Sequence, residues 1–415
     1  EETSSVNMTN IEDMQLAGHC LLMIDSMDLA SKFVVGEMDE GECISVTNGK
    51  EFSKISRLHY VANFNKPHDL DQLFGALKEE QLDVSYVFYL NGMSNNVTGN
   101  QPQTIDELKA IQEHNYAIVH LAKVMADRNL QPSTFSLVTH NLYQTNDMEM
   151  ISYAYSPLIG FFKTLPHEFP ETTFLHIDFS DDVHENYSLY IKKELNNLLA
   201  LAKLAQEKDE TDYSKTAIVA YRGNKRYSPR ITRVELENKA LSDSPLRQNG
   251  FYLITGGLGG VAKLFTEHLL RHCQAKVLLV GRTTLPDNVE EGYFDRSTST
   301  KEKMKCLKEL KSLAQNGGEV HYVACNIADP VQLEAIVAEW EERFGQALNG
   351  VIHLAGVYRE TLLKDETMST LDEMFRAKVY GTFALYQLLK NRPNSIYITS
   401  SSTTTLSSGY MAGAI

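Results

Sequence analysis

Four glycines crowd into a six-residue run, Thr255–Gly260 (TGGLGG), between an apolar stretch, FYLIT at 251–255, and a helix-forming stretch. Glycine lets a backbone approach phosphate closely, and a helix N-terminus offers unpaired N–H groups and a positive dipole end. A strand–turn–helix context therefore predicts a dinucleotide pyrophosphate site. The residues expected there are Thr255, Gly256, Gly257, Leu258, Gly259 and Gly260. A purely structural turn is the weaker interpretation, because each glycine costs conformational entropy on folding.

The next apolar run ends at Gly281–Arg282–Thr283. Folds that bind NAD need a carboxylate near this point for the ribose 2′-hydroxyl, whereas an arginine suits a 2′-phosphate. Gly281 and Arg282 therefore favour NADPH as the cofactor, the alternative being a surface arginine without a role. Later runs add Asn326, Ile327, Ala355 and Gly356 as cofactor-binding candidates, because ligands bind at the carboxyl ends of such strands.

Apolar runs alternate with helical patterns, which predicts an α/β fold of two Rossmann-like, doubly wound halves. Strands are expected at 20–25, 57–64, 84–90, 134–140 and 173–179, and then at 251–255, 276–281, 319–325, 350–356 and 395–401. Residues 105–129 have one continuous helical pattern, and 217–236 resemble a hairpin. The first half has no glycine-rich turn after any strand. We expect it to be a structural, pseudo-Rossmann unit, with an atypical second nucleotide site as the alternative.

Length and composition limit the class of protein. The 415 residues fit two units of about 200 residues each. The net charge of −15 argues against a nucleic-acid partner, and no apolar run approaches the ~18 residues of a membrane span. Five scattered cysteines and a polar N-terminus favour reduced thiols and a cytoplasmic location. The expected organisation is a linker over 1–18, a structural subdomain over 19–235 and a catalytic subdomain over 236–415.

Six motifs occur in the order and spacing of short-chain dehydrogenase/reductases: TGGLGG, LLVGR, ACNIAD, VIHLAGV, FRAKVYGT and YITSSS. Over about residues 19–415 the chain resembles the ketoreductase domain of a modular polyketide synthase, of the bacterial type I class and including its trans-acyltransferase branch. The resemblance implies NADPH-dependent reduction of a β-ketoacyl thioester on the phosphopantetheine of an acyl carrier protein. Neighbouring synthase domains would be the other partners, with no nucleic acid, membrane or metal involved.

The resemblance also implies catalytic residues. Lys378 matches the family lysine, with a solvated helix lysine as the bland alternative, and the family serine is either Ser401 or Ser402. The family tyrosine is expected about 13 residues later, where the sequence has Ile415, while Tyr410 follows the serine by only 8 or 9 residues. We expect either that the catalytic subdomain is truncated before its tyrosine or that the chain is an inactive scaffold. A free-standing reductase of a small ketone is a third, weaker hypothesis.

Two further features leave alternatives open. Tyr358–Arg359–Glu360 replaces the family's aspartate-containing motif, so the stereochemical class of reduction is not readable. The helix expected at 298–315 carries five lysines that would either face an acidic carrier protein or form a solvated face. They are Lys301, Lys303, Lys305, Lys308 and Lys311.

Overall fold

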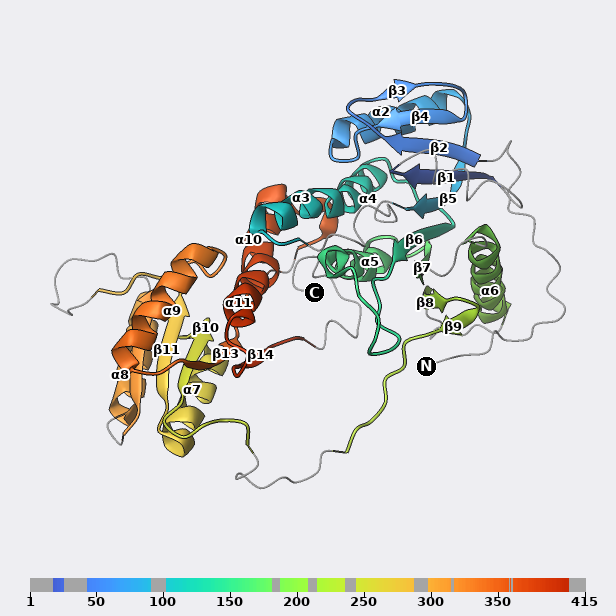
Figure 1. The fold of residues 1–415 in the computed structure, drawn as a ribbon. Coiled ribbons are helices and arrows are strands. Elements are labelled where there is room, and N and C mark those ends of the chain that lie inside the picture. Colours follow the sequence, from blue (N-terminus) through green and yellow to red (C-terminus); the bar gives the residue numbers. More distant parts are fainter. Residues whose placement is uncertain are drawn as a thin grey trace.

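The strands assemble into two separate sheets, which Figure 1 shows in the computed structural model. The structure describes residues 18–25, 43–90, 102–180, 187–207, 215–235, 244–286, 298–314, 317–357, 359 and 361–402. Among these, no helix is both long and apolar enough to cross a membrane.

The first sheet has the strand order β3-β4-β2-β1-β5-β6-β7-β8-β9. Its strands are β1 (His19–Ile24), β2 (Cys43–Asn48), β3 (Ser53–Lys54), β4 (His59–Ala62), β5 (Val84–Tyr89), β6 (Thr134–His140), β7 (Thr173–Phe179), β8 (Thr216–Arg222) and β9 (Lys225–Tyr227). Only β3 and β9, at the two edges, pair antiparallel. The seven parallel strands follow the order 3-2-1-4-5-6-7, which extends the doubly wound Rossmann arrangement.

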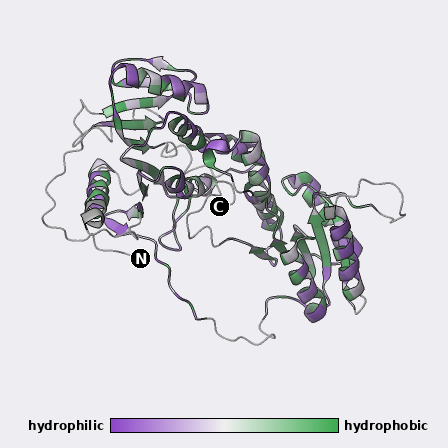
Figure 2. Cartoon of the chain, turned by 180° about the vertical axis from the view of Figure 1, so that it is seen from behind, coloured by the Kyte–Doolittle hydropathy of each residue, from purple (hydrophilic) through white to green (hydrophobic). Residues whose placement is uncertain are grey.

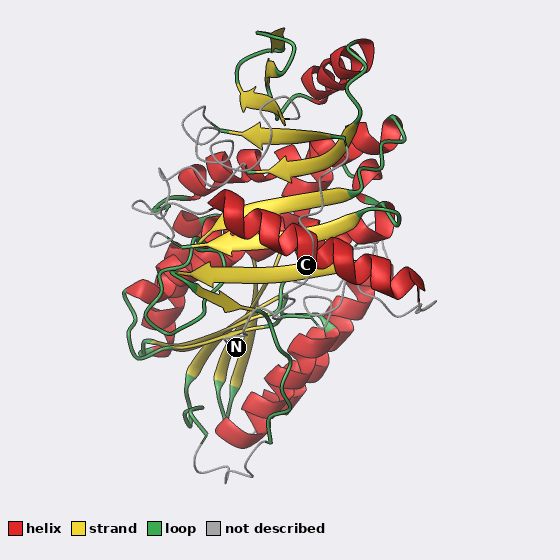
Figure 3. Ribbon diagram, turned by 90° about the vertical axis from the view of Figure 1, so that its right-hand side faces the viewer, coloured by secondary structure: helices red, strands yellow, loops and turns green. Residues whose placement is uncertain are grey.

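Helices cover both faces of this sheet, as Figure 3 shows. They are α2 (Pro67–Glu79), α3 (Ile105–Asn115), α4 (Ala117–Asp127), the short η1 (Tyr153–Tyr155), α5 (Pro157–Glu168) and α6 (Tyr187–Glu207). Alternate residues of β1 enter different cores, because successive strand side chains point to opposite faces. Leu21 and Met23 pack in one cluster, while Cys20 and Leu22 pack in the other, against α6.

The second sheet has the order β12-β11-β10-β13-β14 and repeats the pattern 3-2-1-4-5. Its strands are β10 (Phe251–Thr255), β11 (Lys276–Gly281), β12 (Glu319–Ala324), β13 (Leu348–His353) and β14 (Ile396–Thr399). The helices of this half are α7 (Gly260–Cys273), α8 (Thr298–Ala314), α9 (Pro330–Phe344), η3 (Leu363–Asp365), α10 (Met368–Phe375), η4 (Arg376–Tyr380) and α11 (Gly381–Lys390). Hydrophobic strands lie between helices with hydrophilic outer faces (Figure 2). The order reverses beside β10, which is where such sheets bind ligands.

The two halves share one hydrophobic cluster. Helix α10 and η4 contribute Met374, Phe375 and Tyr380 to the core that also holds α3, α4 and α5, and Figure 1 shows α10 close to α3. The Phe375 ring lies 5.4 Å from that of Tyr116 and 6.0 Å from that of Phe161. The segment that carries Lys378 is therefore packed by both halves of the chain.

The predicted α/β fold of two Rossmann-like halves is confirmed by these two sheets. Three details differ from the sequence prediction. The continuous pattern over 105–129 forms two helices, which meet at Tyr116, and residues 228–235 of the expected hairpin are not a strand. The prediction also lacked β2, whose sequence CISVTN mixes polar and apolar residues although most of the strand is buried.

Candidate functional site

The glycine turn after β10 is required sterically at two of its four glycines. Gly256 has φ +67°, in the left-handed region, and a Cβ there would lie 2.9 Å from the Ala355 nitrogen. A Cβ on Gly257 would lie 2.6 Å from that of Leu279. In contrast, a Cβ on Gly260 would meet nothing within 4 Å. The first two glycines let the turn pack closely between β11 and the segment after β13.

A cavity of about 310 Å³ opens beside this turn, at the carboxyl ends of β10, β11, β12 and β13. The structure brings ten of the predicted cofactor-binding residues to its wall, namely Gly256, Gly257, Leu258, Gly259, Gly281, Arg282, Asn326, Ile327, Ala355 and Gly356. Thr255 and Gly260 are not on the wall. The cavity has the glycine-lined cradle that a pyrophosphate needs.

Thr255 has a positioning role instead. Its hydroxyl oxygen accepts the backbone N–H groups of Leu354 and Ala355, both at 3.2 Å, and its oxygen lies 2.7 Å from Nδ1 of His353. Since that oxygen already accepts two N–H groups, we assign its proton to a hydrogen bond with Nδ1. Burial lowers the pKa of His353 to about 4, so the ring is neutral. This pair ties the glycine turn to the segment after β13, and the sequence analysis did not identify His353.

Basic groups line the cavity beyond β11. The Arg282 guanidinium is largely exposed and lies 3.5 Å from the Glu373 carboxylate of α10. Next to it, the Thr283 hydroxyl accepts a 2.7 Å hydrogen bond from Lys303 Nζ, and the Thr283 carbonyl accepts one of 2.6 Å from the Tyr322 hydroxyl. Both Thr283 and Lys303 line the cavity, and neither was assigned to the cofactor from the sequence.

Lys378 lies on a π-helical segment, η4, within the otherwise continuous run from α10 to α11. Such an inserted turn changes which way a helix presents its side chains and is frequent at functional sites. The Cε atom of Lys378 would lie 2.9 Å from a Cβ on Gly356, so the end of the lysine side chain packs closely against this glycine. Nζ donates to the Ser400 carbonyl at 3.4 Å, and burial lowers the pKa of the lysine.

The structure thus brings Lys378 to the beginning of the serine run. Ser401 and Ser402 follow the end of β14 and are exposed. The structure does not describe Tyr410 or Ile415, the two positions considered for the family tyrosine. Tyr358 and Glu360 also lie outside the described residues. Arg359 is described, and its guanidinium lies 3.5 Å from Glu373.

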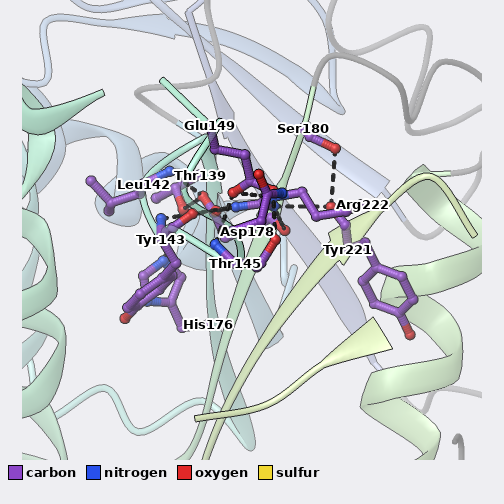
Figure 4. Close-up of polar contacts among 11 residues, drawn as sticks. Thr139, Leu142, Tyr143, Thr145, Glu149, His176, Asp178, Ser180, Tyr221 and Arg222 are labelled. Atoms are coloured by element: carbon purple, nitrogen blue, oxygen red, sulfur yellow. Dashed lines mark hydrogen bonds and ion pairs between the residues drawn. The ribbon is translucent and has the colours of Figure 1, made fainter. Parts of the chain in front are cut away.

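The first sheet has a different arrangement at the carboxyl ends of its strands. A buried polar cluster occupies the carboxyl ends of β6, β7 and β8 (Figure 4). Asp178, which is fully buried, accepts hydrogen bonds from Thr139 Oγ1 at 2.7 Å, from the N–H groups of Leu142 at 2.8 Å and Tyr143 at 3.1 Å, and from Arg222 at 2.8 Å. With its carboxylate satisfied by the protein itself, this edge supports a structural interpretation of the first half.

Two family models match different parts of the chain. Residues 250–413 match the KR domain family, and residues 19–194 match the family described as beta-ketoacyl synthase-like, N-terminal. Polyketide synthase PksM of Bacillus subtilis (strain 168) is 29% identical over 348 residues, which are 84% of this chain and 7% of PksM. A 6-methylsalicylic acid synthase of Arthrobotrys oligospora is 24% identical over 285 residues, 69% of this chain and 15% of that protein. The chain spans only a small part of these relatives.

Two solved structures have a fold similar to that of this chain. A multidomain structure of a keto acid-selecting NRPS module, which contains a ketoreductase, has a TM-score of 0.83 and 26% identity, and the match covers 98% of this chain and 32% of that one. An N-terminal ketoreductase from a macrolactin assembly line has the same fold, with a TM-score of 0.70 and 21% identity over 94% of this chain and 72% of the other. Residues 250–413 thus match the KR domain family, and the chain as a whole is similar to polyketide synthases.

Proposed function

We propose that this chain is the ketoreductase that reduces a β-ketoacyl thioester on an acyl carrier protein, using NADPH held in the cavity beside β10. The observation that carries the proposal is the position of a half-buried lysine, Lys378, against Gly356 on the wall of a glycine-lined cavity. A structural turn alone would need neither the cavity nor a lysine beside it.

The residues present fit a dinucleotide phosphate. Gly256 and Gly257 keep the turn free of side chains where a Cβ would collide with neighbouring strands, and the N–H groups at the beginning of α7 suit the pyrophosphate. Arg282 suits a 2′-phosphate, because a guanidinium makes charge-assisted hydrogen bonds to phosphate oxygens. Bound NADPH would supply the hydride for the reduction of a ketone.

The chain's own groups would then handle charge on the ketone oxygen. An exposed hydroxyl, from Ser401 or Ser402, would donate a hydrogen bond to that oxygen and stabilise the negative charge that develops on it. Lys378 would hold a positive charge beside these serines, which favours the deprotonated form of a nearby acid such as the family tyrosine. The proton donor itself belongs to residues outside those the structure describes.

Two other functions remain as candidates. An inactive scaffold would keep the fold and pack against neighbouring synthase domains without turnover. The similarity to a keto acid-selecting module, at a TM-score of 0.83, favours a second substrate class, a keto acid held as a thioester. Acyl carrier protein, neighbouring domains and a cytoplasmic location are parts of the same proposal.

The test is turnover by the full-length protein. It would be incubated with NADPH and with either a β-ketoacyl or a 2-ketoacyl thioester of N-acetylcysteamine, and the hydroxyacyl product would be measured by mass spectrometry. We expect β-hydroxyacyl product, reduced about 10²–10⁴-fold by Lys378→Ala. Lys390→Ala, an exposed lysine of the adjoining helix, is the matched control and should be unaffected. A wild-type protein that binds NADPH but reduces neither thioester would be a scaffold.

A further inference from the structure

Among the five lysines of α8, Lys303 differs from the other four. Lys301, Lys305, Lys308 and Lys311 are exposed, whereas Lys303 is half-buried and lines the cavity. Its position is fixed by the 2.7 Å hydrogen bond to the Thr283 hydroxyl. A solvated helix face explains the other four lysines but not this one.

The charge of Lys303 has no counter-ion among the described residues. No carboxylate there lies within 4.0 Å of its Nζ, although Lys263 of the neighbouring helix pairs with Glu309 at 2.6 Å. An ammonium has three hydrogens to donate, and the Thr283 hydroxyl takes one of them. The remaining two are available to an anion in the cavity.

Arg282 lies on the same wall but already has a partner. Its guanidinium is 3.5 Å from Glu373, a carboxylate that also lies 3.5 Å from Arg359. A phosphate at Arg282 would have to compete with this carboxylate, and the nearby negative charge would weaken its binding. Lys303 has no such competitor in the described structure, which makes it the better source of positive charge for a phosphate group on this side of the cavity.

We propose that Lys303, held by Thr283, is a second cationic ligand for the 2′-phosphate of NADPH and contributes to cofactor specificity at least as much as Arg282. This inference rests on the proposed function, since it assigns a residue to the cofactor of that site. The recognised group is a phosphate monoester on a ribose, so free adenosine 2′,5′-bisphosphate should bind through the same residue and adenosine 5′-monophosphate should not depend on it.

The test compares four ligands by titration calorimetry on the full chain, and needs no turnover. NADPH and adenosine 2′,5′-bisphosphate carry the 2′-phosphate, while NADH and adenosine 5′-monophosphate lack it. We expect Lys303→Ala to weaken the first two about tenfold, the effect of losing one charge-assisted contact, and to leave the last two unchanged. Lys303→Arg should restore most of the affinity. Lys305→Ala, an exposed lysine of the same helix, is the matched control and should bind all four as the wild type does.

Each contrary result has a distinct meaning. A wild type that prefers NADPH, together with a Lys303→Ala variant of equal preference, would overturn the role of Lys303 and leave the proposed cofactor in place. Equal weakening of NADH and NADPH would show a general disturbance of the cavity and would also overturn the specificity role. A wild type that binds neither nucleotide, or both equally, would overturn the proposed NADPH site and this inference with it.

Discussion

Replacing Gly256 by alanine is expected to destabilise the second half of the chain even without a cofactor. At φ +67° a residue with a Cβ is strained by about 1–2 kcal/mol. The new Cβ would also lie 2.9–3.0 Å from three backbone atoms of Leu354 and Ala355, which cannot rotate away as a side chain could. Such overpacking costs about 1–3 kcal/mol more. The sum predicts a loss of about 2–5 kcal/mol in the free energy of unfolding.

The loss of stability in the second half of the chain can be measured by tryptophan emission. Trp340, the one tryptophan of the sequence, is buried in the core of the second sheet. Urea titration followed by its emission should show the midpoint lowered by about 1–2.5 M for Gly256→Ala, if the slope is about 2 kcal/mol/M. Far-UV circular dichroism on the same samples would show whether the first half unfolds in the same transition.

Gly260→Ala is the matched control. Gly260 begins α7, and a Cβ there meets nothing within 4 Å, so alanine should leave the stability unchanged or raise it by up to about 1 kcal/mol. Equal destabilisation by the two substitutions would refute the steric argument, because the structure assigns a collision to only one of them. An unchanged midpoint for Gly256→Ala would refute it as well.

Three further predictions concern charge. Arg282→Ala should weaken the binding of NADPH, measured by cofactor fluorescence, and leave the binding of NADH unchanged, although Glu373 competes for the guanidinium. Equal effects on both cofactors would contradict the assignment of Arg282 to the 2′-phosphate. Asp178→Asn should cost about 1–3 kcal/mol in the free energy of unfolding, since it removes the charged acceptor of several buried donors and leaves Glu149 as the remaining carboxylate beside Arg222. Asp71→Asn, in a partly exposed pair, should cost less than about 1 kcal/mol, and similar losses for the two variants would contradict the buried role of Asp178. The stability reported by tryptophan emission should fall as the pH drops from about 6.5 to 4, because burial depresses the pKa of His353 and the unfolded chain therefore takes up a proton first. His353→Gln should flatten this dependence on pH, and an unchanged slope would contradict the role of His353.

The glycine turn was predictable because its signal is local. TGGLGG lies between a strand and a helix in the sequence itself, and ten of the predicted cofactor-binding residues do line one cavity. Lys378 came from the resemblance, not from spacing, since nothing in RAKVYG alone predicts a π-helical segment. Which serine acts, and whether Lys378 acts at all, stay predictions.

The residues that sequence reasoning missed depend on contacts between distant segments. Lys303 meets Thr283 across 20 residues, and His353 meets Thr255 across 98. No periodicity reports such a pair, because each residue alone is an ordinary helix lysine or strand histidine. The break between α3 and α4 is similar, since it occurs at Tyr116, whose ring stacks on Phe375 of the second half.

Hydrogen–deuterium exchange of the full chain with and without NADPH tests the central claim, that only the second half holds the cofactor. The account predicts slower exchange in the peptides that cover 256–260, 281–283 and 354–357, around the cavity. The first half should show no such change at 141–145, where the backbone is already bonded to Asp178. Protection at 141–145 comparable to that at 256–260, or no protection at saturating NADPH, would contradict the account.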